Sequence, residues 1–487
     1  MESSEANVAS WLGRPDPDRV ALIDDERSLT YGALDDRCAR LAGVLAAAGI
    51  GRGDRVAVLL GNHASYLEAV FACARLGAIV VPLNNRLAPP ELDVQLRDCS
   101  AVGLLAEAEL AEKVPAPPRF VLTADAYEDA IAGAPAQPVA EVSPDDPLMI
   151  LYTSGTTGRP KGALLPHRKT LYNSLNAEIF FRLTPEDRVL VALPLFHSFG
   201  LNILSLPMLH VGGRVILQRR FDPERAWKTC AEEGVSFFGA VPTMFQRLLE
   251  AFPEKRPPSL RFLFTAGAAI PVATIRAYER RGVVLKQGFG QTETSILCCL
   301  SEEDAIRKAG SVGRPVHHAE LRCIEPESGH DVAPGETGEI VVRGPITMLG
   351  YWEHPEGTQE TFRGGWLHTG DLATVDAEGF YTLVGRAREM FISGGENVYP
   401  AEIEAVYEHH PEVAEIAVRG VPDERWGEVG RAWVVPSPGA QPDPEGLAAW
   451  GRERLASFKI PVQFQVVSEL PRTITGKVQK HLLPEIA

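Results

Sequence analysis

Short apolar runs that alternate with helical patterns are the feature that most constrains how this chain can fold. The runs at 20–24 and 55–60 have the length and composition of buried strands, whereas 31–50 and 63–76 repeat apolar residues at the spacing of a helix. After a Pro/Ala-rich stretch at 132–147 the alternation resumes, with strand-like runs at 189–194, 214–218, 237–242, 261–267 and 283–290. Strands that alternate with helices predict a largely parallel sheet with crossover helices, and therefore an α/β fold.

The pattern changes near residue 310, where short strands with glycine turns replace the alternation. These strands are expected at 338–345, 365–373 and 379–386. Such closely spaced strands pair most simply with their neighbours in sequence, which makes an antiparallel arrangement. We therefore expect a small antiparallel, barrel-like part at the end of the large domain.

The tail beyond residue 388 has the texture of a small domain of its own. Helical patterns at 400–409 and 445–455 are interleaved with strand-like runs. We therefore expect a large N-terminal domain over 1–387, with parallel-rich sheets and packed helices, and a small, mobile C-terminal α+β domain over 388–487.

Composition and charge exclude several classes of protein. The net charge of 48 − 64 = −16 argues against a nucleic-acid binder, which needs a basic face. The seven cysteines form no Cys-x-x-Cys pair, which favours reduced cytosolic thiols over a disulfide framework or a zinc site. Residues 1–10 are too acidic and polar for a signal peptide, and no apolar run reaches the length of a membrane span, about 18 residues. We expect a cytoplasmic protein.

The stretch TSGTTGRPKG, residues 153–162, has a composition that no packed core would use. Its glycines and hydroxyl residues leave backbone N–H groups unpaired, and Lys161 adds a cation, which suits a polyphosphate ligand. The pattern is not a Walker A loop, because Pro160 stands where that motif requires its second glycine. From local composition alone, a flexible exposed loop remains equally compatible with this stretch.

Seven motifs in a fixed order resolve that ambiguity. They are YTSGTTGRPKG (152–162), PLFHSFG (194–200), TAGAAI (265–270), QGFGQTE (287–293), GWLHTGDLA (365–373), VGRAREMFISGGENVYPAEIE (384–404) and PRTITGKV (471–478). Together they resemble the adenylate-forming superfamily, which includes acyl-CoA synthetases, nonribosomal adenylation domains and luciferases, and the resemblance covers nearly the whole chain. The segments 303–315 and 392–404 look most like bacterial fatty-acyl-CoA synthetases.

The resemblance implies a two-step reaction that uses ATP, Mg²⁺ and coenzyme A. A carboxylate attacks the α-phosphate of ATP to give acyl-AMP and pyrophosphate, and the coenzyme A thiol then displaces AMP. Among the catalytic candidates, Lys477 would offset charge on the α-phosphate, Thr292 would contact that phosphate, and His197 would line and gate the acyl pocket. Glu293 would bind Mg²⁺, with Thr153 as a second candidate ligand.

Each catalytic candidate also has a plainer interpretation. Lys477 could be a solvated surface lysine, His197 a satisfied core histidine, and Thr292 with Glu293 the cap of a helix. In the family, the residue two positions after the arginine of the Gly-Arg pair is a Lys or Asp and serves as the hinge. In this chain that residue is Arg388. It keeps the charge of a lysine but is bulkier.

The resemblance also implies a set of residues that bind the nucleotide and coenzyme A. The phosphate loop comprises Thr153, Ser154, Gly155, Thr156, Thr157, Gly158 and Lys161. The adenine and ribose side comprises Gly267, Ala268, Ala269, Gly288, Phe289, Gly290, Asp371 and Arg386, and the tunnel for the pantetheine arm is lined by Gly394 and Gly395. Purely structural roles are core packing for Phe289, a turn position for Asp371 and a salt bridge for Arg386.

The expected acyl site is mostly apolar and contains no lysine or arginine. Its candidate lining residues are Phe199, Gly200, Ile203, Ala240, Val241, Thr243, Met244, Ala266 and Ile296. A dicarboxylic acid would need a cation there, so a fatty acid is expected first and an aryl acid second. The motifs are also compatible with an adenylation enzyme that loads a carrier protein, a luciferase-type oxidase, or a nucleotide-binding protein without catalysis. The expected partners are small molecules, and the protein is expected to be a monomer or a homodimer.

Overall fold

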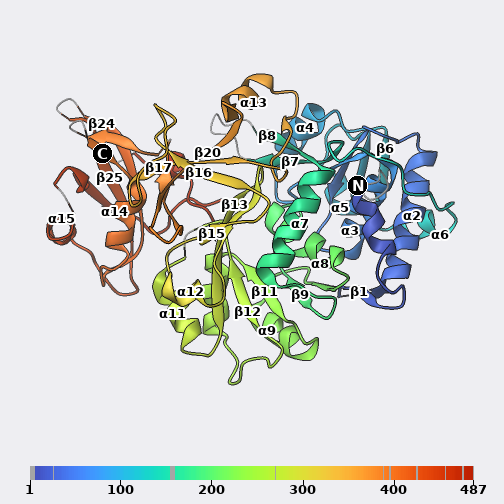
Figure 1. Ribbon diagram of the computed structural model, residues 1–487, viewed down its shortest axis with the longest axis horizontal. Coiled ribbons are helices and arrows are strands. Elements are labelled where there is room, and N and C mark those ends of the chain that lie inside the picture. The colour runs from blue at the N-terminus through green and yellow to red at the C-terminus, as the bar shows by residue number, and fades with distance from the viewer. Residues whose placement is uncertain are drawn as a thin grey trace. The chain divides into compact units, whose positions relative to one another are not determined.

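A nine-stranded sheet, ordered β15-β14-β13-β12-β11-β9-β10-β1-β2, is the largest in the chain (Figure 1). The strands from β1 to β13 in that order run parallel, and β2, β14 and β15 are antiparallel additions at the two edges. Their bounds are β1 (Val20–Ile23), β2 (Ser28–Thr30), β9 (Arg188–Val191), β10 (Arg214–Leu217), β11 (Phe237–Ala240), β12 (Phe262–Thr265), β13 (Val284–Gln291), β14 (Ser295–Cys299) and β15 (Arg314–Pro315).

Three helices cover one face of this sheet. They are α9 (Pro223–Glu232), α10 (Pro242–Glu250) and α11 (Val272–Glu279). Trp227, Phe245 and Tyr278, one from each helix, are buried in a single core with apolar residues of β9 to β13. The entry into α9 is typical, since Pro223 occupies its first turn and the Asp222 carboxylate accepts a hydrogen bond from the Arg225 N–H.

A seven-stranded sheet, ordered β18-β8-β7-β4-β3-β5-β6, forms the second layer of strands in the same part of the chain. Its strands are β3 (Arg55–Leu59), β4 (Ile79–Pro82), β5 (Gly103–Ala106), β6 (Phe120–Thr123), β7 (Pro147–Thr153), β8 (Lys161–Pro166) and β18 (Gly350–Tyr351). Leu92 and Leu96 of α4 (Pro89–Asp98) pack on Val81 and Leu104 of this sheet. β7 and β8 are antiparallel neighbours, paired from Pro147 with Pro166 to Thr153 with Lys161.

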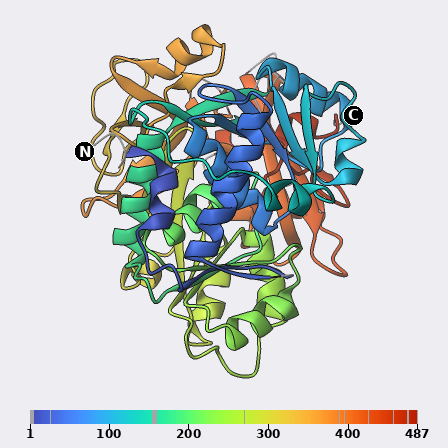
Figure 2. The same cartoon turned by 90° about the vertical axis from the view of Figure 1, so that its right-hand side faces the viewer.

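The remaining helices of this part lie between and beside the sheets. They are η1 (Val8–Gly13), α2 (Tyr31–Ala47), α3 (Ala64–Leu76), α5 (Ala108–Ala111), α6 (Tyr127–Ala132), α7 (His167–Phe181), the π-helical η2 (Phe199–Ser205), α8 (Leu206–His210), α12 (Asp304–Arg307) and α13 (Pro355–Thr361). Figure 2 looks onto α2 and α3, in blue, which pack against each other. Helix α3 ends at Gly77, whose φ of 68° suits glycine at a helix C-terminus.

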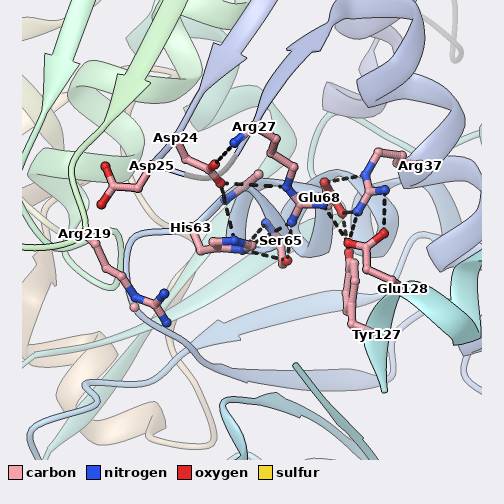
Figure 3. A network of polar contacts seen from close by, with 12 residues as sticks. Asp24, Asp25, Arg27, Arg37, His63, Ser65, Glu68, Tyr127, Glu128 and Arg219 are labelled. Atoms are coloured by element: carbon pink, nitrogen blue, oxygen red, sulfur yellow. Dashed lines mark hydrogen bonds and ion pairs between the residues drawn. The ribbon is translucent and has the colours of Figure 1, made fainter. Parts of the chain in front are cut away.

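A network of charged side chains ties α2, α3 and α6 together (Figure 3). The fully buried Glu68 carboxylate accepts hydrogen bonds from Arg37 at 2.8 and 3.2 Å and from the Tyr127 hydroxyl at 2.6 Å. Glu128 accepts from Arg37 and from Arg27, at 2.7 and 2.6 Å. A buried carboxylate is tolerated here because every charge has a partner in the network.

The C-terminal part contains two further sheets. The first, ordered β16-β17-β20-β19 with β21 beside β20, is formed by β16 (Glu320–Ile324), β17 (Thr337–Arg343), β19 (Phe362–Arg363), β20 (Trp366–Val375) and β21 (Tyr381–Arg386). The second, ordered β23-β22-β25-β24 with β26 beside β25, is formed by β22 (Phe391–Ser393), β23 (Glu396–Val398), β24 (Val413–Asp423), β25 (Gly427–Pro436) and β26 (Gln463–Val466). Helices α14 (Pro400–Tyr407) and α15 (Pro444–Arg452) pack on it, with short turns η3 (Ser457–Lys459) and η4 (Lys480–Leu482).

The computed structural model describes residues 6–25, 27–153, 160–268, 270–387, 389–393, 396–423, 426–455, 457–473 and 476–485. The chain divides into two compact units, which we call unit 1 (Met1–Glu320 and Val342–Leu367) and unit 2 (Leu321–Val341 and His368–Ala487). The predicted α/β fold, the antiparallel part and the α+β tail are confirmed. The predicted domain boundary between residues 387 and 388 separates the large domain from the part expected to be mobile. That boundary stays a prediction.

Most sequence-predicted elements are present, with ends that shift by a few residues. The helix expected at 31–50 ends at Ala47, and the one expected at 445–455 is Pro444–Arg452. All seven cysteines are buried free thiols. Within the part of the chain that the structure describes, no helix combines the length and hydropathy needed to cross a bilayer.

Candidate active site

The two ends of the expected phosphate loop are held together by the β7–β8 ladder. Thr153 is the last residue of β7 and pairs with Lys161, the first residue of β8. The Thr153 hydroxyl also donates a hydrogen bond to the Lys161 carbonyl at 3.3 Å. The loop residues themselves, Ser154, Gly155, Thr156, Thr157 and Gly158, lie outside the described residues. The ladder thus fixes the point from which the Lys161 side chain starts.

The Lys161 ammonium lies over the ring of Tyr351, 5.2 Å from the ring centre. Gly357, at the start of α13, leaves the space that this ammonium needs. A Cβ atom at position 357 would approach Lys161 Nζ to 3.0 Å and His354 Nδ1 to 2.7 Å. The His354 ring is fixed there because its Nδ1 accepts a hydrogen bond from the Gly357 N–H at 2.9 Å.

Glu293 lies in the tight turn between β13 and β14. Gln291 pairs with Ser295 across this turn, and Gly290 is required because a Cβ there would overlap the Ser295 carbonyl. Ser295 itself has a left-handed φ of 61°. The Tyr351 hydroxyl donates a hydrogen bond to Glu293 Oε1 at 2.9 Å. The interpretation of Thr292 and Glu293 as a helix cap is wrong, because they form a hairpin turn.

A buried lysine on α7 supports the same turn from the helix side. Lys169 is 1% exposed, and its ammonium donates a hydrogen bond to the Ser295 hydroxyl. Burial lowers the pKa of Lys169 to about 7, although the nearby Glu293 carboxylate favours the charged form. One helical turn on, Asn173 Oδ1 accepts a hydrogen bond from the Ile296 N–H at 3.3 Å. Helix α7 therefore anchors the hairpin that carries Glu293.

The adenine-side candidates follow neighbouring parallel strands. Gly267 and Ala268 follow the end of β12 at Thr265 by two and three residues, and Gly288 lies on β13 beside it. A Cβ at Gly288 would lie 2.7 Å from the Phe264 ring, so the two strands approach too closely for a larger residue. Phe289 is only 9% exposed, so much of its ring is packed. Ala269 lies outside the described residues.

In the part of the chain that the structure describes, four buried polar atoms in the predicted acyl-side and adenine-side motifs lack hydrogen-bond partners. Within the described residues, His197 Nε2, Ser198 Oγ, Thr265 Oγ1 and Gln287 Oε1 are buried and accept or donate no hydrogen bond. Thr265, the last residue of β12, is the register partner of Gln287, which lies within β13. Burial and the Arg86 charge lower the pKa of His197 to about 4, so its ring is neutral at physiological pH. One interpretation of His197 is a core histidine whose ring nitrogens are all hydrogen-bonded. That interpretation is wrong within the described residues, because Nε2 is buried and has no hydrogen-bond partner.

In unit 2, Asp371 and Arg386 are partners across the β20–β21 ladder. Arg386 Nε lies 3.0 Å from Asp371 Oδ1, and Asp371 is 6% exposed. The turn before the aspartate is fixed by Thr369, whose hydroxyl accepts from the Asp371 N–H at 3.1 Å and donates to the Ile340 carbonyl at 2.7 Å. The salt bridge considered for Arg386 is therefore present, and it orients the carboxylate predicted to bind ribose.

Lys477 lies in a narrow hairpin near the end of the chain. The Thr473 N–H donates to the Lys477 carbonyl at 2.7 Å, and the Lys477 N–H donates to the Thr473 hydroxyl at 3.1 Å. Desolvation and the neighbouring Arg386 guanidinium lower the pKa of Lys477, while Asp371 acts in the opposite direction. Within unit 2, the structure thus brings Lys477 into the neighbourhood of the predicted ribose-binding pair.

A buried ion cluster fixes the hairpin that carries Lys477. Lys480 Nζ lies 2.7 Å from Glu404 Oε1 and 3.2 Å from Glu389 Oε2. Glu404 Oε1 also accepts a hydrogen bond from the Val418 N–H at 2.6 Å, which ties α14 to β24. The predicted hinge Arg388 and the tunnel residues Gly394 and Gly395 lie outside the described residues.

The chemistry of the donor set fits a magnesium ion that is shared with a substrate. Among the described residues, no cluster of three or more His, Cys, Asp or Glu side chains could hold a metal ion. Mg²⁺ keeps several waters and binds through one or two carboxylates together with phosphate oxygens, so a single oriented carboxylate is enough. Glu293 provides such a carboxylate, and Oε2 accepts no hydrogen bond from a described residue.

Sequence reasoning missed Tyr351 and Lys169. Tyr351 lies 58 residues from Glu293 in sequence, and nothing local to it points to that partner. For Lys169 a signal existed, because Lys169, Asn173 and Asn176 repeat at i, i+4 and i+7 and so form one polar stripe on α7. All three are buried, which marks the stripe as a support for neighbouring polar groups.

Two family profiles match the chain, that of AMP-binding enzymes over residues 10–352 and that of the AMP-binding enzyme C-terminal domain over residues 402–477. The chain therefore belongs to the AMP-binding enzyme family, within the adenylate-forming superfamily. It is an AMP-forming acid–thiol ligase, and the relatives it resembles make coenzyme A thioesters.

Three relatives show how close the similarity is. Feruloyl-CoA synthase of Amycolatopsis sp is 44% identical over 482 residues, which are 97% of this chain and 97% of the relative. Long-chain-fatty-acid–CoA ligase FadD13 of Mycobacterium tuberculosis is 36% identical over 473 residues, 94% of this chain and 93% of the relative. The solved structure of o-succinylbenzoate coenzyme A synthetase (MenE) from Bacillus subtilis, in complex with ATP and magnesium ion, superposes with a TM-score of 0.87 at 33% identity, and the match covers 98% of this chain and 99% of that one.

Proposed function

We propose that this protein joins an aryl carboxylic acid to coenzyme A and converts ATP to AMP and pyrophosphate. The observation that carries the proposal is the meeting of two distant motifs of unit 1 through Tyr351. The phosphate-loop Lys161 contacts Tyr351, and Tyr351 contacts the Glu293 carboxylate. A cation for phosphate and an oriented carboxylate for a phosphate-bound metal are what the activation of an acid by ATP requires.

In the first step, a carboxylate oxygen of the acid attacks the α-phosphorus and the bond to pyrophosphate breaks. Lys477 would offset the negative charge that builds on the α-phosphate, and Thr292 would donate its hydroxyl there. Lys161 with Thr153, Ser154, Thr156 and Thr157 would hold the β- and γ-phosphates. A magnesium ion bound at Glu293 would neutralise phosphate charge. Asp371, oriented by Arg386, would accept hydrogen bonds from the ribose hydroxyls.

In the second step, the coenzyme A sulfur attacks the acyl carbon and AMP leaves. We propose that rotation at Arg388 withdraws Lys477 and brings Gly394 and Gly395 to the path of the pantetheine arm. The neutral His197 would line the acyl site, where its unpartnered Nε2 can meet the carboxylate or acyl oxygen.

We further propose a cytoplasmic location.

The relatives favour an aryl acid over the fatty acid that the sequence motifs favour. Feruloyl-CoA synthase has the higher identity, 44% against 36% for the fatty-acid ligase. The unpartnered hydroxyl of Ser198, in the acyl-side motif, also favours a substrate that bears hydrogen-bonding substituents, because an alkyl chain would leave it unsatisfied. A fatty acid remains the second candidate, since the expected acyl residues Ala240, Val241 and Ile296 are apolar and buried.

The test is AMP release with ATP, Mg²⁺ and a panel of acids, with and without coenzyme A. We expect turnover that depends on coenzyme A and is faster with hydroxylated or methoxylated cinnamic and benzoic acids than with octanoic or palmitic acid. Acyl-AMP that accumulates despite coenzyme A would instead indicate an enzyme that loads a carrier protein. The absence of AMP release with every acid would contradict the proposal.

A further inference from the structure

We propose that Tyr351 is a positioning residue that couples the lysine of the phosphate loop to the carboxylate of Glu293. Its hydroxyl donates to Glu293 Oε1 at 2.9 Å, and the face of its ring lies 5.2 Å from Lys161 Nζ. One side chain thus contacts two charged groups that belong to motifs more than a hundred residues apart. The inference rests on the proposed function, because it gives Lys161 and Glu293 their roles toward ATP and magnesium.

The segment around Tyr351 fixes both the backbone and the side chain of Glu293. The Met348 N–H donates to the Glu293 carbonyl at 2.8 Å, while the Tyr351 hydroxyl holds the carboxylate. A carboxylate with one oxygen hydrogen-bonded loses its free rotation, so its second oxygen points in one direction. Outer partners of this kind orient metal-binding carboxylates and contribute strongly to metal affinity.

The aromatic ring holds Lys161 in a way that keeps its donors available. An ammonium over a ring face is attracted by the ring quadrupole and uses none of its three N–H groups for this contact. Within the described residues, Lys161 Nζ donates no hydrogen bond, and Gly357 leaves it room. The ammonium is therefore positioned before ATP binds, and its N–H groups remain for phosphate oxygens.

The chain offers a matched control for the hydroxyl of Tyr351. Tyr127 donates to the Glu68 carboxylate at 2.6 Å, within the network that ties α6 to α3 (Figure 3). Glu68 is satisfied by Arg37 and is not part of the nucleotide motifs. Tyr127→Phe therefore removes the same kind of contact, a phenol hydroxyl donating to a carboxylate, away from the candidate active site.

The experiment measures ATP binding by calorimetry without any acid substrate, in EDTA and across a Mg²⁺ titration. Tyr351→Phe removes the hydroxyl and keeps the ring, so we expect the Mg²⁺ concentration at half-saturation to rise about tenfold while ATP binding in EDTA is unchanged. Tyr351→Leu removes both, and we expect ATP binding in EDTA to weaken as well, about two- to fivefold. In steady-state assays the KM for Mg·ATP should rise in Tyr351→Phe, with kcat within about twofold of the parent.

The controls separate this role from a loss of folding stability. Tyr127→Phe should lower the thermal midpoint and leave both binding constants unchanged. The proposal is overturned if Tyr351→Phe binds Mg·ATP as the parent does, if it weakens binding equally in EDTA and in Mg²⁺, or if Tyr127→Phe has the same effect. If the parent binds no ATP under any condition, the proposed function fails and this inference with it; if the parent binds ATP and only the variants contradict us, the proposed function stands.

Discussion

At position 477 the main chain is hydrogen-bonded, and within the described residues the side-chain ammonium has no hydrogen-bond partner. The hairpin fixes the main chain through Thr473, and within the described residues the Lys477 ammonium donates no hydrogen bond. The cluster around Lys480 holds the same hairpin against α14. An ammonium that lacks a hydrogen-bond partner in its own unit can bind a ligand without first breaking an internal bond.

Lys477→Ala should therefore affect one half-reaction and spare the other. We expect acyl-AMP formation to slow by about 10²- to 10³-fold, the usual effect of losing one donor to a developing charge. Thioester formation from supplied acyl-AMP should stay close to the parent rate, because the thiol attack needs no such cation. Rapid-quench measurement of each half-reaction gives the result, and equal losses in both would contradict the assignment.

His167 shows how burial of a single residue makes stability depend on pH. Its Nδ1 accepts a hydrogen bond from the Val8 N–H at 3.2 Å, and burial lowers its pKa to about 4. In the unfolded chain a histidine has a pKa of about 6.5, so between these values acid protonates the unfolded state preferentially. The stability contribution is complete above pH 6.5 and is lost as the pH falls towards 4.

At pH 5 this loss amounts to about 2 kcal/mol for His167. His167→Asn keeps an acceptor for the Val8 N–H but cannot be protonated. We expect the free energy of unfolding of the variant to fall less steeply between pH 7 and pH 5 than that of the parent. Urea titrations at both pH values measure this difference, and parallel pH profiles for variant and parent would refute the assignment.

At the scale of elements, the contribution of an ion pair to the free energy of unfolding depends on how deeply the pair is buried. The pair between Arg37 of α2 and Glu68 of α3 is enclosed, with 18% and 0% of the side chains exposed. On the same helix, the pair between Arg40 and Asp36 is open to solvent, at 38% and 54%. Removing one partner of an enclosed pair leaves a buried charge, whereas an open pair is replaced by water.

Arg37→Ala should therefore destabilise unit 1 far more than Arg40→Ala does. We expect a loss of about 3 kcal/mol for Arg37→Ala, because among the described residues Glu68 then keeps only the hydrogen bond from the Tyr127 hydroxyl. Arg40→Ala should cost about 0.5 kcal/mol or less. Chemical denaturation of both variants tests this, and similar values for the two would contradict the argument from burial.

At the scale of the whole molecule, the proposed pair of half-reactions leads us to expect that the C-terminal part changes its pose. Within unit 2 the charges of Arg386 and Asp371 act on the Lys477 ammonium, and we propose that this arrangement serves adenylate formation. Thioester formation needs Lys477 elsewhere and a path for pantetheine, which we attribute to rotation at Arg388. If each half-reaction uses its own pose, restricting the backbone at the hinge should slow thioester formation and leave the rate of adenylate formation largely unchanged.

Arg388→Pro tests that prediction, because proline fixes φ near −65° and removes a backbone N–H. We expect the parent rate of adenylate formation to be largely retained and thioester formation to slow about tenfold or more. Arg388→Ala is the control, since it removes the side chain and keeps the backbone free, and it should support both half-reactions. If Arg388→Pro carries out both at the parent rate, the hinge does not lie at this residue.

Much of the fold was predictable because its signals are local. The strand-like runs at 55–60 and 237–242 became β3 and β11, and the helical pattern at 63–76 became α3. The hairpin turn at Glu293 was not predicted, because a Thr-Glu pair suits a helix start equally well and the geometry depends on Gly290 and Ser295. The buried role of Lys169 was also missed, since lysines are rarely buried.

The amino-acid sequence by itself determined the α/β class, the order of the elements and the family, because hydrophobic periodicity and motif residues are properties of contiguous segments. Only the tertiary structure decided that Tyr351 meets Glu293 and Lys161, that Lys169 is enclosed beneath the same turn, and that Arg386 pairs with Asp371. These contacts join residues distant in the chain, and they depend on strand register and helix packing, which no local pattern encodes.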